Sequence, residues 1–396
     1  MMQISPEIQL FIREHSSDDV RVLALQAKKY PDIDMPTVIT QIAGRKVAAE
    51  KIPSWWEIEK IWYPKHLSLE QCSSEITARY KARLLQGDSL TDLTGGFGID
   101  CSFLATGFKS ATYVERQQEL CEIAAHNFPV LNLNHINVRN EDGVAYLQTM
   151  SPVDCIFLDP ARRNEHGGKT VAISDCEPNV AELEALLLSK ANRVMIKLSP
   201  MLDLSLALKE LKHTQEIHIL SVNNECKELL ILLGQTSPAE IAIHCVNLLT
   251  KGTQEEQHLV FTREQEQRSQ CTYTDSLGNY LYEPNASLLK AGAFRSIAAA
   301  YPVRKLHPNS HLYTSDSFIE NFPGRIFRIV NQCSFNKKEV KENLADLKKA
   351  NVTVRNFPAT VAELRKRIHL AEGGDTYLFA STLNNGQKVL IRCEKV

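Results

Sequence analysis

The stretch Leu90-Thr-Asp-Leu-Thr-Gly-Gly-Phe-Gly-Ile-Asp100 decides the fold of this chain. A short apolar run ends at Asp92, and the small residues Thr94, Gly96 and Gly98 follow at alternate positions before a helical pattern begins. Small residues allow the backbone to turn tightly and to approach a ligand closely, and the first turn of a helix presents unpaired N–H groups. Because a purely structural glycine turn has the same pattern, the surrounding sequence has to decide between the two.

Short apolar runs alternate with helical stretches beyond this loop. Roughly ten or more residues of helical periodicity separate most of the runs, which is typical of parallel strands joined by helical crossovers. The predicted strands are residues 89–94, 111–115, 136–139, 155–159, 194–198 and 216–222. Residues 228–233 form another apolar run, and it follows its predecessor so closely that it must run antiparallel to its neighbour. We therefore predict a doubly wound α/β fold with a reversed last strand.

Acidic residues follow four of the predicted strands. Besides Asp92, Glu115 ends the second strand, Asp142 follows the third, and Asp159-Pro160 ends the fourth. Open α/β sheets bind ligands at these strand ends, where Glu115 is placed to accept from ribose hydroxyls and Asp142 from an adenine amino group. Glu115 can instead be an ordinary solvated acid at a strand end, and Asp142 can instead cap the N-terminus of the following helix. A dinucleotide dehydrogenase is disfavoured, since Cys101 occupies the place of its third glycine.

The composition indicates an ordinary globular protein. The 396 residues are 43% hydrophobic and 23% charged, and the formal net charge of −2 supplies no global attraction to nucleic acid or membrane. The ten cysteines form no C-x-x-C pair, and the sequence shows neither a secretory leader nor a membrane-length apolar run. We therefore expect a cytoplasmic protein with reduced thiols. Since His126 and His135 are isolated, we expect no metal site.

The length and the changes of pattern predict several domains. We divide the chain into a helical N-terminal region, an α/β ligand-binding domain, a connecting region with strands, and a small α+β domain. These are residues 1–88, 89–235, 236–320 and 321–396. In the last region we predict strands at residues 325–330 and 352–355, helices at 337–350 and 361–367, and a hairpin around Asn384-Asn-Gly386.

The strand-end motifs resemble those of class I S-adenosylmethionine-dependent methyltransferases over about residues 70–235. The resemblance implies S-adenosyl-L-methionine as cofactor. The implied cofactor-binding residues are Asp92, Thr94, Gly96, Phe97, Gly98, Glu115, Asp142 and Asp159.

More narrowly, the chain is similar to bacterial methyltransferases that carry a THUMP-like C-terminal domain and are related to cap guanine-N2 methyltransferases. The matching segments are residues 73–81, 159–162, 197–200, 283–287 and 372–375. This likeness implies a ferredoxin-like segment near residues 275–318 and a THUMP-like domain from about residue 322.

The resemblance also implies that Asp159, Pro160 and Arg162 lie at the methyl acceptor. There the Asp159 carboxylate and the Pro160 carbonyl would accept the hydrogens of an attacking base amine. Relatives that methylate amines have an aromatic residue where this chain has Arg162, which can stack on a base or hold a phosphate instead. Lys197 at the fifth strand end and Lys81 near the expected cofactor carboxylate either contact a ligand or are ordinary lysines with a solvated amine.

We therefore predict a methyltransferase acting on a base nitrogen of RNA, with the oligomeric state left open. The basic positions for RNA contact are Arg162, Arg163, Lys337-Lys338, Lys348-Lys349 and Arg365-Lys-Arg367, although short basic runs are also common on solvated helices. Methylation of a protein or small molecule is one alternative, and a binding module that keeps the cofactor pocket without catalysis is another. A covalent route is not supported, because neither Cys155 nor Cys176 has a neighbouring base.

Overall fold

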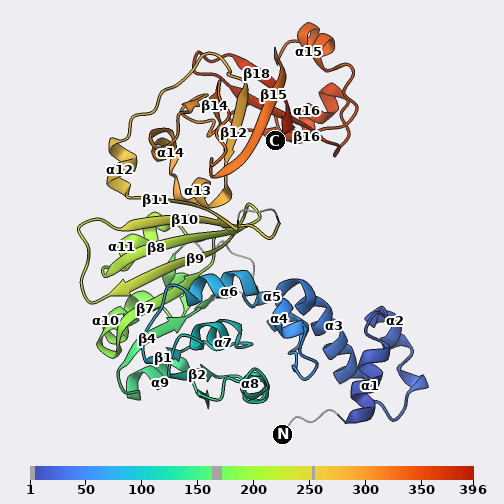
Figure 1. Cartoon of the computed structure of the whole chain (residues 1–396), viewed down its shortest axis with the longest axis vertical. Helices are drawn as coiled ribbons and strands as arrows, with labels where there is room; N and C mark the ends of the chain where they lie inside the picture. Colours follow the sequence, from blue (N-terminus) through green and yellow to red (C-terminus); the bar gives the residue numbers. More distant parts are fainter. Residues whose placement is uncertain (1–4, 163–171, 252–254) are drawn as a thin grey trace. The chain divides into compact units, whose positions relative to one another are not determined.

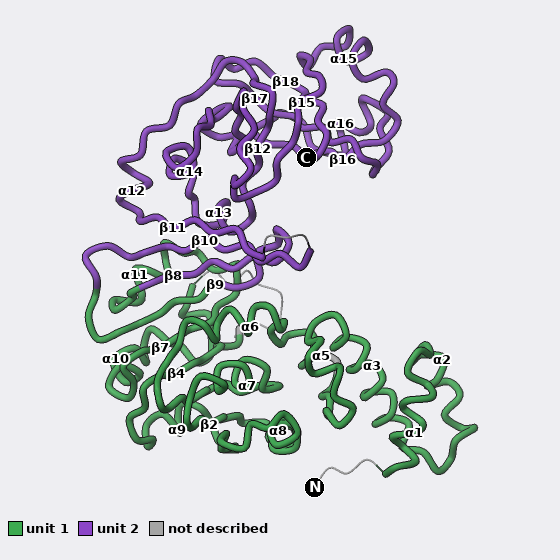
Figure 2. Tube along the Cα trace, in the orientation of Figure 1, with its two compact units in different colours: residues 1–215, 230–237 green, residues 216–229, 238–396 purple. Residues whose placement is uncertain are grey.

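A computed structural model describes residues 5–162, 172–251 and 255–396 of the chain. The chain divides into two compact units, of residues 1–215 with 230–237 and residues 216–229 with 238–396 (Figure 2). Among the described helices, none combines the length and the apolar character needed to cross a membrane. All ten cysteines lie in the described ranges and are free thiols.

The first unit begins with helices, as the sequence predicts (Figure 1). They are α1 (Pro6–Glu14), α2 (Val20–Leu25), α3 (Met35–Lys51), α4 (Pro53–Trp56), α5 (His66–Gln71) and α6 (Glu75–Ala82). Side chains of Ser5, Asp19 and Asp34 cap the first three, each accepting a backbone N–H that the helix leaves unpaired. Trp55 and Tyr63 bury their rings in a hydrophobic cluster that also contains residues of the glycine loop region.

Parallel strands and connecting helices follow in the first unit. The strands are β1 (Ser89–Asp92), β2 (Ser110–Glu115), β3 (Ile136–Asn140), β4 (Val153–Leu158) and β7 (Ala191–Leu198). The helices between and after them are α7 (Ile99–Ala105), α8 (Gln118–Val130), α9 (Gly143–Thr149), α10 (Val180–Lys190) and α11 (Leu204–Glu210). β1 pairs in parallel with β2 and β4, β2 with β3, and β4 with β7. The carboxyl ends of these strands therefore meet at one edge of the sheet.

A hairpin confirms the predicted strand reversal. β8 (Thr214–Val222) and β9 (Glu225–Gly234) are joined by Asn223 and Asn224 alone, whose φ angles are 48° and 69°. Two residues with positive φ make the tight turn that suits antiparallel strands, and asparagine tolerates that conformation. The strand order of the sheet is β11-β10-β8-β9-β7-β4-β1-β2-β3, so the reversed strand lies between β7 and β8.

Two strands predicted in the connecting region extend this same sheet. β10 (Ala242–Leu248) pairs in parallel with β8, and β11 (Glu256–Phe261) pairs antiparallel with β10. Their place in this sheet is not visible in the sequence, because local periodicity does not reveal the partners of strands across a long connection.

A second sheet occupies the C-terminal part of the second unit. Its order is β13-β14-β12-β15-β18-β17-β16. The strands are β12 (Tyr280–Pro284), β13 (Arg304–Lys305), β14 (Tyr313–Ser315), β15 (Gly324–Ser334), β16 (Asn351–Val354), β17 (Thr376–Thr382) and β18 (Lys388–Lys395). The helices of this region are α12 (Arg263–Arg268), α13 (Ala286–Ala291), α14 (Phe294–Ala300), α15 (Lys337–Leu344) and α16 (Val361–Ile368). β15 pairs with both β12 and β18, so one sheet runs through this part of the chain.

Helix α15 is shorter than the helix predicted for residues 337–350. It ends at Leu344, and the chain turns extended soon afterwards, where Lys349 forms a β-bridge with Ala371. The N–H of Ala350 then donates to the carbonyl of Ala371 at 3.1 Å. Pairing with a distant segment therefore overrides the helical propensity of the lysine-rich sequence.

Candidate functional site

The loop between β1 and α7 depends on its glycines. Gly96 and Gly98 have φ angles of 55° and 86°, in the left-handed region that glycine adopts without steric cost. A Cβ at Gly95 would lie 2.2 Å from the ring of Tyr113, so this position must lack a side chain. A Cβ at Gly96 would meet no atom closer than the Thr94 carbonyl oxygen at 3.8 Å. The loop therefore packs tightly against Tyr113 at Gly95, whereas the position that a Gly96 side chain would occupy is free of close protein atoms.

Hydrogen bonds from backbone N–H groups to side chains tie the loop to two neighbouring strand ends. The N–H of Asp159, after β4, donates to Thr94 Oγ1 at 2.6 Å. Glu115 at the end of β2 accepts the N–H of Gly96 through Oε2 and that of Gln117 through Oε1, each at 2.9 Å. Glu115 and Asp159, two of the strand-end acids predicted from the sequence, are thereby brought to one place with a third, Asp92 at the end of β1.

Asp92 is a buried carboxyl with one unpaired oxygen. Its Oδ1 accepts the N–H of Thr94 at 2.9 Å, whereas its buried Oδ2 has no hydrogen-bond partner among the described residues. Burial raises the pKa of Asp92 to about 8, against the lowering effect of the Thr94 N–H, and nearby acidic side chains add to the rise. A buried oxygen without a partner is costly, so it marks a place where a donor from a ligand would fit.

Asp142 caps helix α9. Its Oδ1 accepts the N–H groups of Val144 and Ala145, both at 3.0 Å, and the residue is exposed. Next to it, Gly143 packs so closely on the loop that a Cβ there would lie 2.2 Å from the Leu93 carbonyl oxygen. The helix-cap role considered in the sequence analysis is therefore present, and the packing of Gly143 places Asp142 beside the residues after β1.

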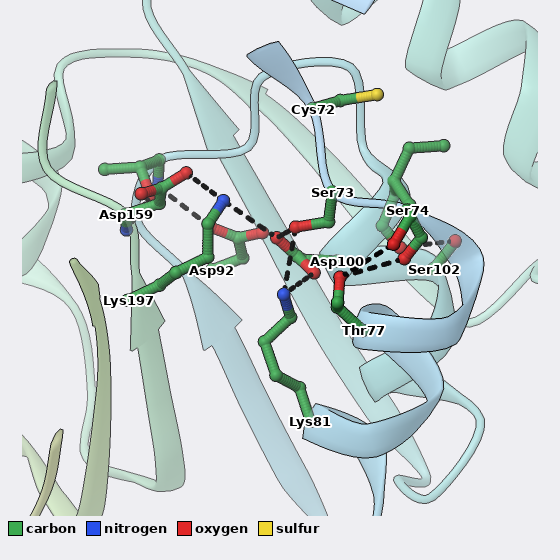
Figure 3. Close-up of polar contacts among 12 residues, drawn as sticks. Cys72, Ser73, Ser74, Thr77, Lys81, Asp92, Asp100, Ser102, Asp159 and Lys197 are labelled. Atoms are coloured by element: carbon green, nitrogen blue, oxygen red, sulfur yellow. Dashed lines mark hydrogen bonds and ion pairs between the residues drawn. The ribbon is translucent and has the colours of Figure 1, made fainter. Parts of the chain in front are cut away.

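A network of four charged side chains lies beside Asp92 (Figure 3). Lys197 at the end of β7 contacts the carboxylate of Asp159 and lies 3.4 Å from Asp100 Oδ2. Lys81 of α6 is completely buried, and its Nζ lies 3.0 Å from Asp100 Oδ1. The network therefore connects the helix before β1, the first turn of α7, and the ends of two strands.

Ser73 completes this network. Its hydroxyl donates to Asp100 Oδ2 at 2.7 Å and accepts from Lys81 Nζ at 2.9 Å. Asp100 is thus held by two ammonium groups and a hydroxyl, which is the arrangement that lets a buried carboxylate stay ionised.

The two acids of the network have opposite pKa shifts. Burial acts to raise the pKa of Asp100, but Lys81 and Lys197 outweigh it and hold the pKa below the ordinary carboxyl value. For Asp159 the removal of water outweighs the attraction of Lys197, so its pKa is raised. Asp100 is therefore the stronger acid of the two, and Asp159 takes up a proton at higher pH than Asp100 does.

The remaining predicted site residues have different environments. Phe97 is buried and packs edge-on against Trp55, with 5.2 Å between ring centroids, so its side chain fixes the loop to the N-terminal helices. Pro160 is buried. The backbone of Arg162 lies in the short strand β5 (Ala161–Arg162), but its side chain and all of Arg163 lie outside the described residues.

Sequence reasoning missed Asp100 and Ser73. An acid in the first turn of a helix is usually explained by the helix dipole, so Asp100 gave no separate signal. The sequence indicates for Lys81 and Lys197 either a ligand contact or an ordinary solvated amine, whereas the structure pairs both with Asp100. The usable signal was Lys197, because a lysine inside an apolar strand requires a buried counter-charge.

The strand order, with its reversed strand between β7 and β8, and the glycine loop beside strand-end acids define the class I methyltransferase fold. A solved structure of a candidate methyltransferase from Porphyromonas gingivalis W83 is 36% identical to this chain, covers 100% of both chains and has a TM-score of 0.87. The chain therefore belongs to the family of that protein. Residues 324–395 match the family described as THUMP domain-like, and residues 280–323 match a ferredoxin-like domain family.

Weaker likenesses cover only part of the chain. M. capricolum TrmK, in complex with S-adenosyl-homocysteine, is 13% identical and covers 41% of this chain and 68% of its own, with a TM-score of 0.32. A candidate methyltransferase from Streptococcus mutans, also in complex with S-adenosyl-homocysteine, is 11% identical and has a TM-score of 0.30. The match covers 40% of this chain and 96% of that one. None of the curated proteins matches it.

Proposed function

We propose that this protein is an S-adenosyl-L-methionine-dependent methyltransferase that acts on a base nitrogen of RNA. The observation that carries the proposal is the meeting of Asp92, Glu115 and Asp159 around the glycine loop, with Asp92 Oδ2 buried and unpaired among the described residues. Membership of a methyltransferase family supports the same reading. We retain the four-region division of the chain as part of this proposal, with residues 89–235 binding the cofactor.

The residues around the loop fit this cofactor in three respects. The unpaired Asp92 Oδ2 can accept from an ammonium group, and a cation there would favour the ionised carboxylate. Each Glu115 oxygen accepts one backbone N–H and keeps a second lone pair for a ribose hydroxyl. The open space above Gly96 admits a ligand against the backbone. The proposed set is Asp92, Thr94, Gly96, Gly98, Glu115, Asp142 and Asp159, with Phe97 contributing through its backbone.

Asp159 and Pro160 are the residues we assign to the acceptor. The cofactor, when bound, supplies an electrophilic methyl group, and the protein has to align an attacking nitrogen and accept its hydrogens. The carboxylate of Asp159 and the carbonyl of Pro160 serve as those acceptors. Lys197 contacts the Asp159 carboxylate and opposes the rise of its pKa, so it keeps this group ready to accept. We keep Arg162 as the residue that stacks on the base or holds a phosphate.

The choice of RNA as substrate is supported by the C-terminal region. Residues 324–395 match a THUMP-like family. Lys337 and Lys338 at the start of α15, and Lys348 and Lys349 after it, are exposed and available to phosphates. In α16, Arg365 is held by the Ala350 carbonyl.

The test uses full-length protein, tritiated S-adenosylmethionine and total RNA from cells that lack the gene. We expect label in RNA with the wild type and with Asp88→Ala, an exposed acid outside the site, but not with Asp159→Ala. Binding of cofactor to each variant is measured separately, so that loss of transfer is distinguished from loss of binding. Label in protein or small molecules instead of RNA would reject the RNA proposal. Tight cofactor binding with no labelled acceptor would identify a binding module.

A further inference from the structure

Three histidines and a glutamate lie in a row across three strands of the second unit. Glu216 and His218 lie two residues apart on β8, so their side chains share one face of the sheet. His244 on β10 is the direct parallel partner of His218 in the strand register. His258 lies on the next strand, β11. Residues far apart in sequence are thus gathered by strand pairing.

The side-chain atoms of this row are close together. Glu216 Oε2 lies 3.3 Å from His218 Nε2 and 3.9 Å from His244 Nε2. The rings of His218 and His244 are stacked, with centroids 4.2 Å apart. One ligand atom from each of Glu216, His218 and His244 can be chosen so that all lie within 4.8 Å of one another.

We propose that Glu216, His218 and His244 bind a divalent transition-metal ion, with Zn²⁺ as the best match. Two imidazole nitrogens and one carboxylate oxygen form a common ligand set for zinc, with a fourth position left for water. Bond lengths of about 2.0–2.2 Å in a tetrahedral site place ligand atoms roughly 3.3–3.5 Å apart. The pair Glu216–His218 already has this spacing. His244 Nε2, at 3.9 Å, has to approach Glu216 by about half an ångström. The ligand atoms of His218 and His244, which lie within 4.8 Å of each other, have to approach by up to roughly 1.4 Å.

The stacked rings have to rotate slightly for both nitrogens to face one ion, because their planes are only 15° apart. The site is half-open, which permits this adjustment and the entry of water. The side chain of His218 is 3% exposed, whereas those of His244 and Glu216 are 21% and 33% exposed.

His258 holds the ring of His244 from the other side. Its Nε2 lies 3.2 Å from His244 Nδ1, so Nδ1–H can donate to His258 while Nε2 faces Glu216. Metal-binding histidines commonly donate their second ring nitrogen in this way, which fixes the tautomer and the ring orientation.

The proposal is independent of the methyltransferase function. Its four residues all belong to the second unit, whereas the loop and acids of the candidate cofactor site belong to the first. It replaces the expectation of no metal site drawn from the sequence. That expectation considered spacing along the chain, and the row is created by the pairing of strands.

The test is a zinc titration of chelator-stripped, full-length protein in competition with a chromogenic chelator. We expect one zinc per chain and at least a tenfold loss of affinity in His244→Gln and in Glu216→Gln. These residues are part-exposed, so both variants should fold, which circular dichroism checks. The matched control is His126→Gln, whose ring nitrogen contacts the Lys60 carbonyl at 2.9 Å outside the row, and it should bind zinc like the wild type.

A second arm examines His258. Because His258 contacts Nδ1 of His244, whereas the proposed metal-binding nitrogen is Nε2, His258→Gln should weaken zinc binding by about 10–100-fold without abolishing it. Failure to bind one equivalent of zinc would overturn the proposal. Equal affinity in the wild type, His244→Gln and Glu216→Gln would also overturn it, because the bound zinc would then lie elsewhere.

Discussion

The N–H of Asp159 donates to the hydroxyl of Thr94 at 2.6 Å, which joins the loop after β1 to the end of β4. Thr94 in turn donates its own N–H to Asp92. One residue therefore sets the position of both acids, the one we assign to the cofactor and the one we assign to the methyl acceptor.

Replacing Thr94 tests this relationship. Thr94→Val removes the acceptor and leaves the part-buried N–H of Asp159 unpaired, which should lower the free energy of unfolding by about 1–2 kcal/mol. We also expect a slower methyl transfer, because Asp159 loses its anchor. Thr94→Ser keeps the hydroxyl and should behave like the wild type in chemical denaturation and in the transfer assay. Equal behaviour of the two variants would show that the bond is unimportant.

Cofactor affinity should depend on pH through Asp92. Its pKa of about 8 means that the carboxyl is largely protonated at neutral pH in the free protein. A cationic ligand group favours the ionised form, so binding should release up to one proton, and affinity should rise with pH by up to about tenfold per unit below pH 8. Calorimetry in two buffers of different ionisation enthalpy measures the release. Asp92→Asn should bind more weakly and without this pH dependence; a wild-type affinity that is flat from pH 6 to 8 would contradict the assignment.

Lys197 should set the pH range of methyl transfer. Its ammonium group lowers the pKa of Asp159, so Lys197→Met should raise that pKa further. The acidic limb of the pH–rate profile should then move to higher pH by about one unit or more, since Asp159 must be ionised to accept a proton. Lys197→Arg keeps the charge and should restore most of the wild-type profile. A uniform loss of rate without a shift would point to a structural role instead.

Gly95 should be irreplaceable for packing. In Gly95→Ala the new methyl group would lie 2.2 Å from the Tyr113 ring, which must move or force the loop away from β2. We expect a loss of about 1–3 kcal/mol in the unfolding of the first unit. Gly107→Ala is the matched control, because its nearest atom is the Leu104 carbonyl oxygen at 3.7 Å. Thermal unfolding followed by calorimetry compares the two, and similar melting temperatures would refute the packing argument.

The exposed lysines at the start of α15 should contribute to RNA affinity. In the double variant Lys337→Glu with Lys338→Glu, we expect weaker binding to RNA of any sequence. The slope of log affinity against log salt concentration should fall by the amount that corresponds to about one or two lost phosphate contacts. Lys109→Glu, an exposed lysine of the first unit, serves as the control. Fluorescence anisotropy at several salt concentrations gives both quantities. Unchanged binding of the double variant would exclude this helix from RNA contact.

Local sequence was sufficient for the architecture around the loop. A run of apolar residues ending at Asp92, glycines at fixed offsets and an acid at or after each of the next three strands are short-range patterns, and they constrain the backbone directly. The reversed strand was also predictable, because two residues such as Asn223 and Asn224 cannot form a parallel crossover. The exact end of α15 was not predictable from the sequence. The extended segment after the helix pairs with Ala371, and local periodicity does not reveal so distant a partner.

Tertiary structure alone decided which charges meet. Lys81, Asp100 and Lys197 come from two helices and a strand, and only the folded sheet brings both lysines to within hydrogen-bonding distance of Asp100. The same holds for His218 and His244, which strand register places side by side. Sequence determines periodicity and turns because these depend on neighbouring residues, whereas buried charge pairs and metal-binding rows depend on register and packing between distant segments.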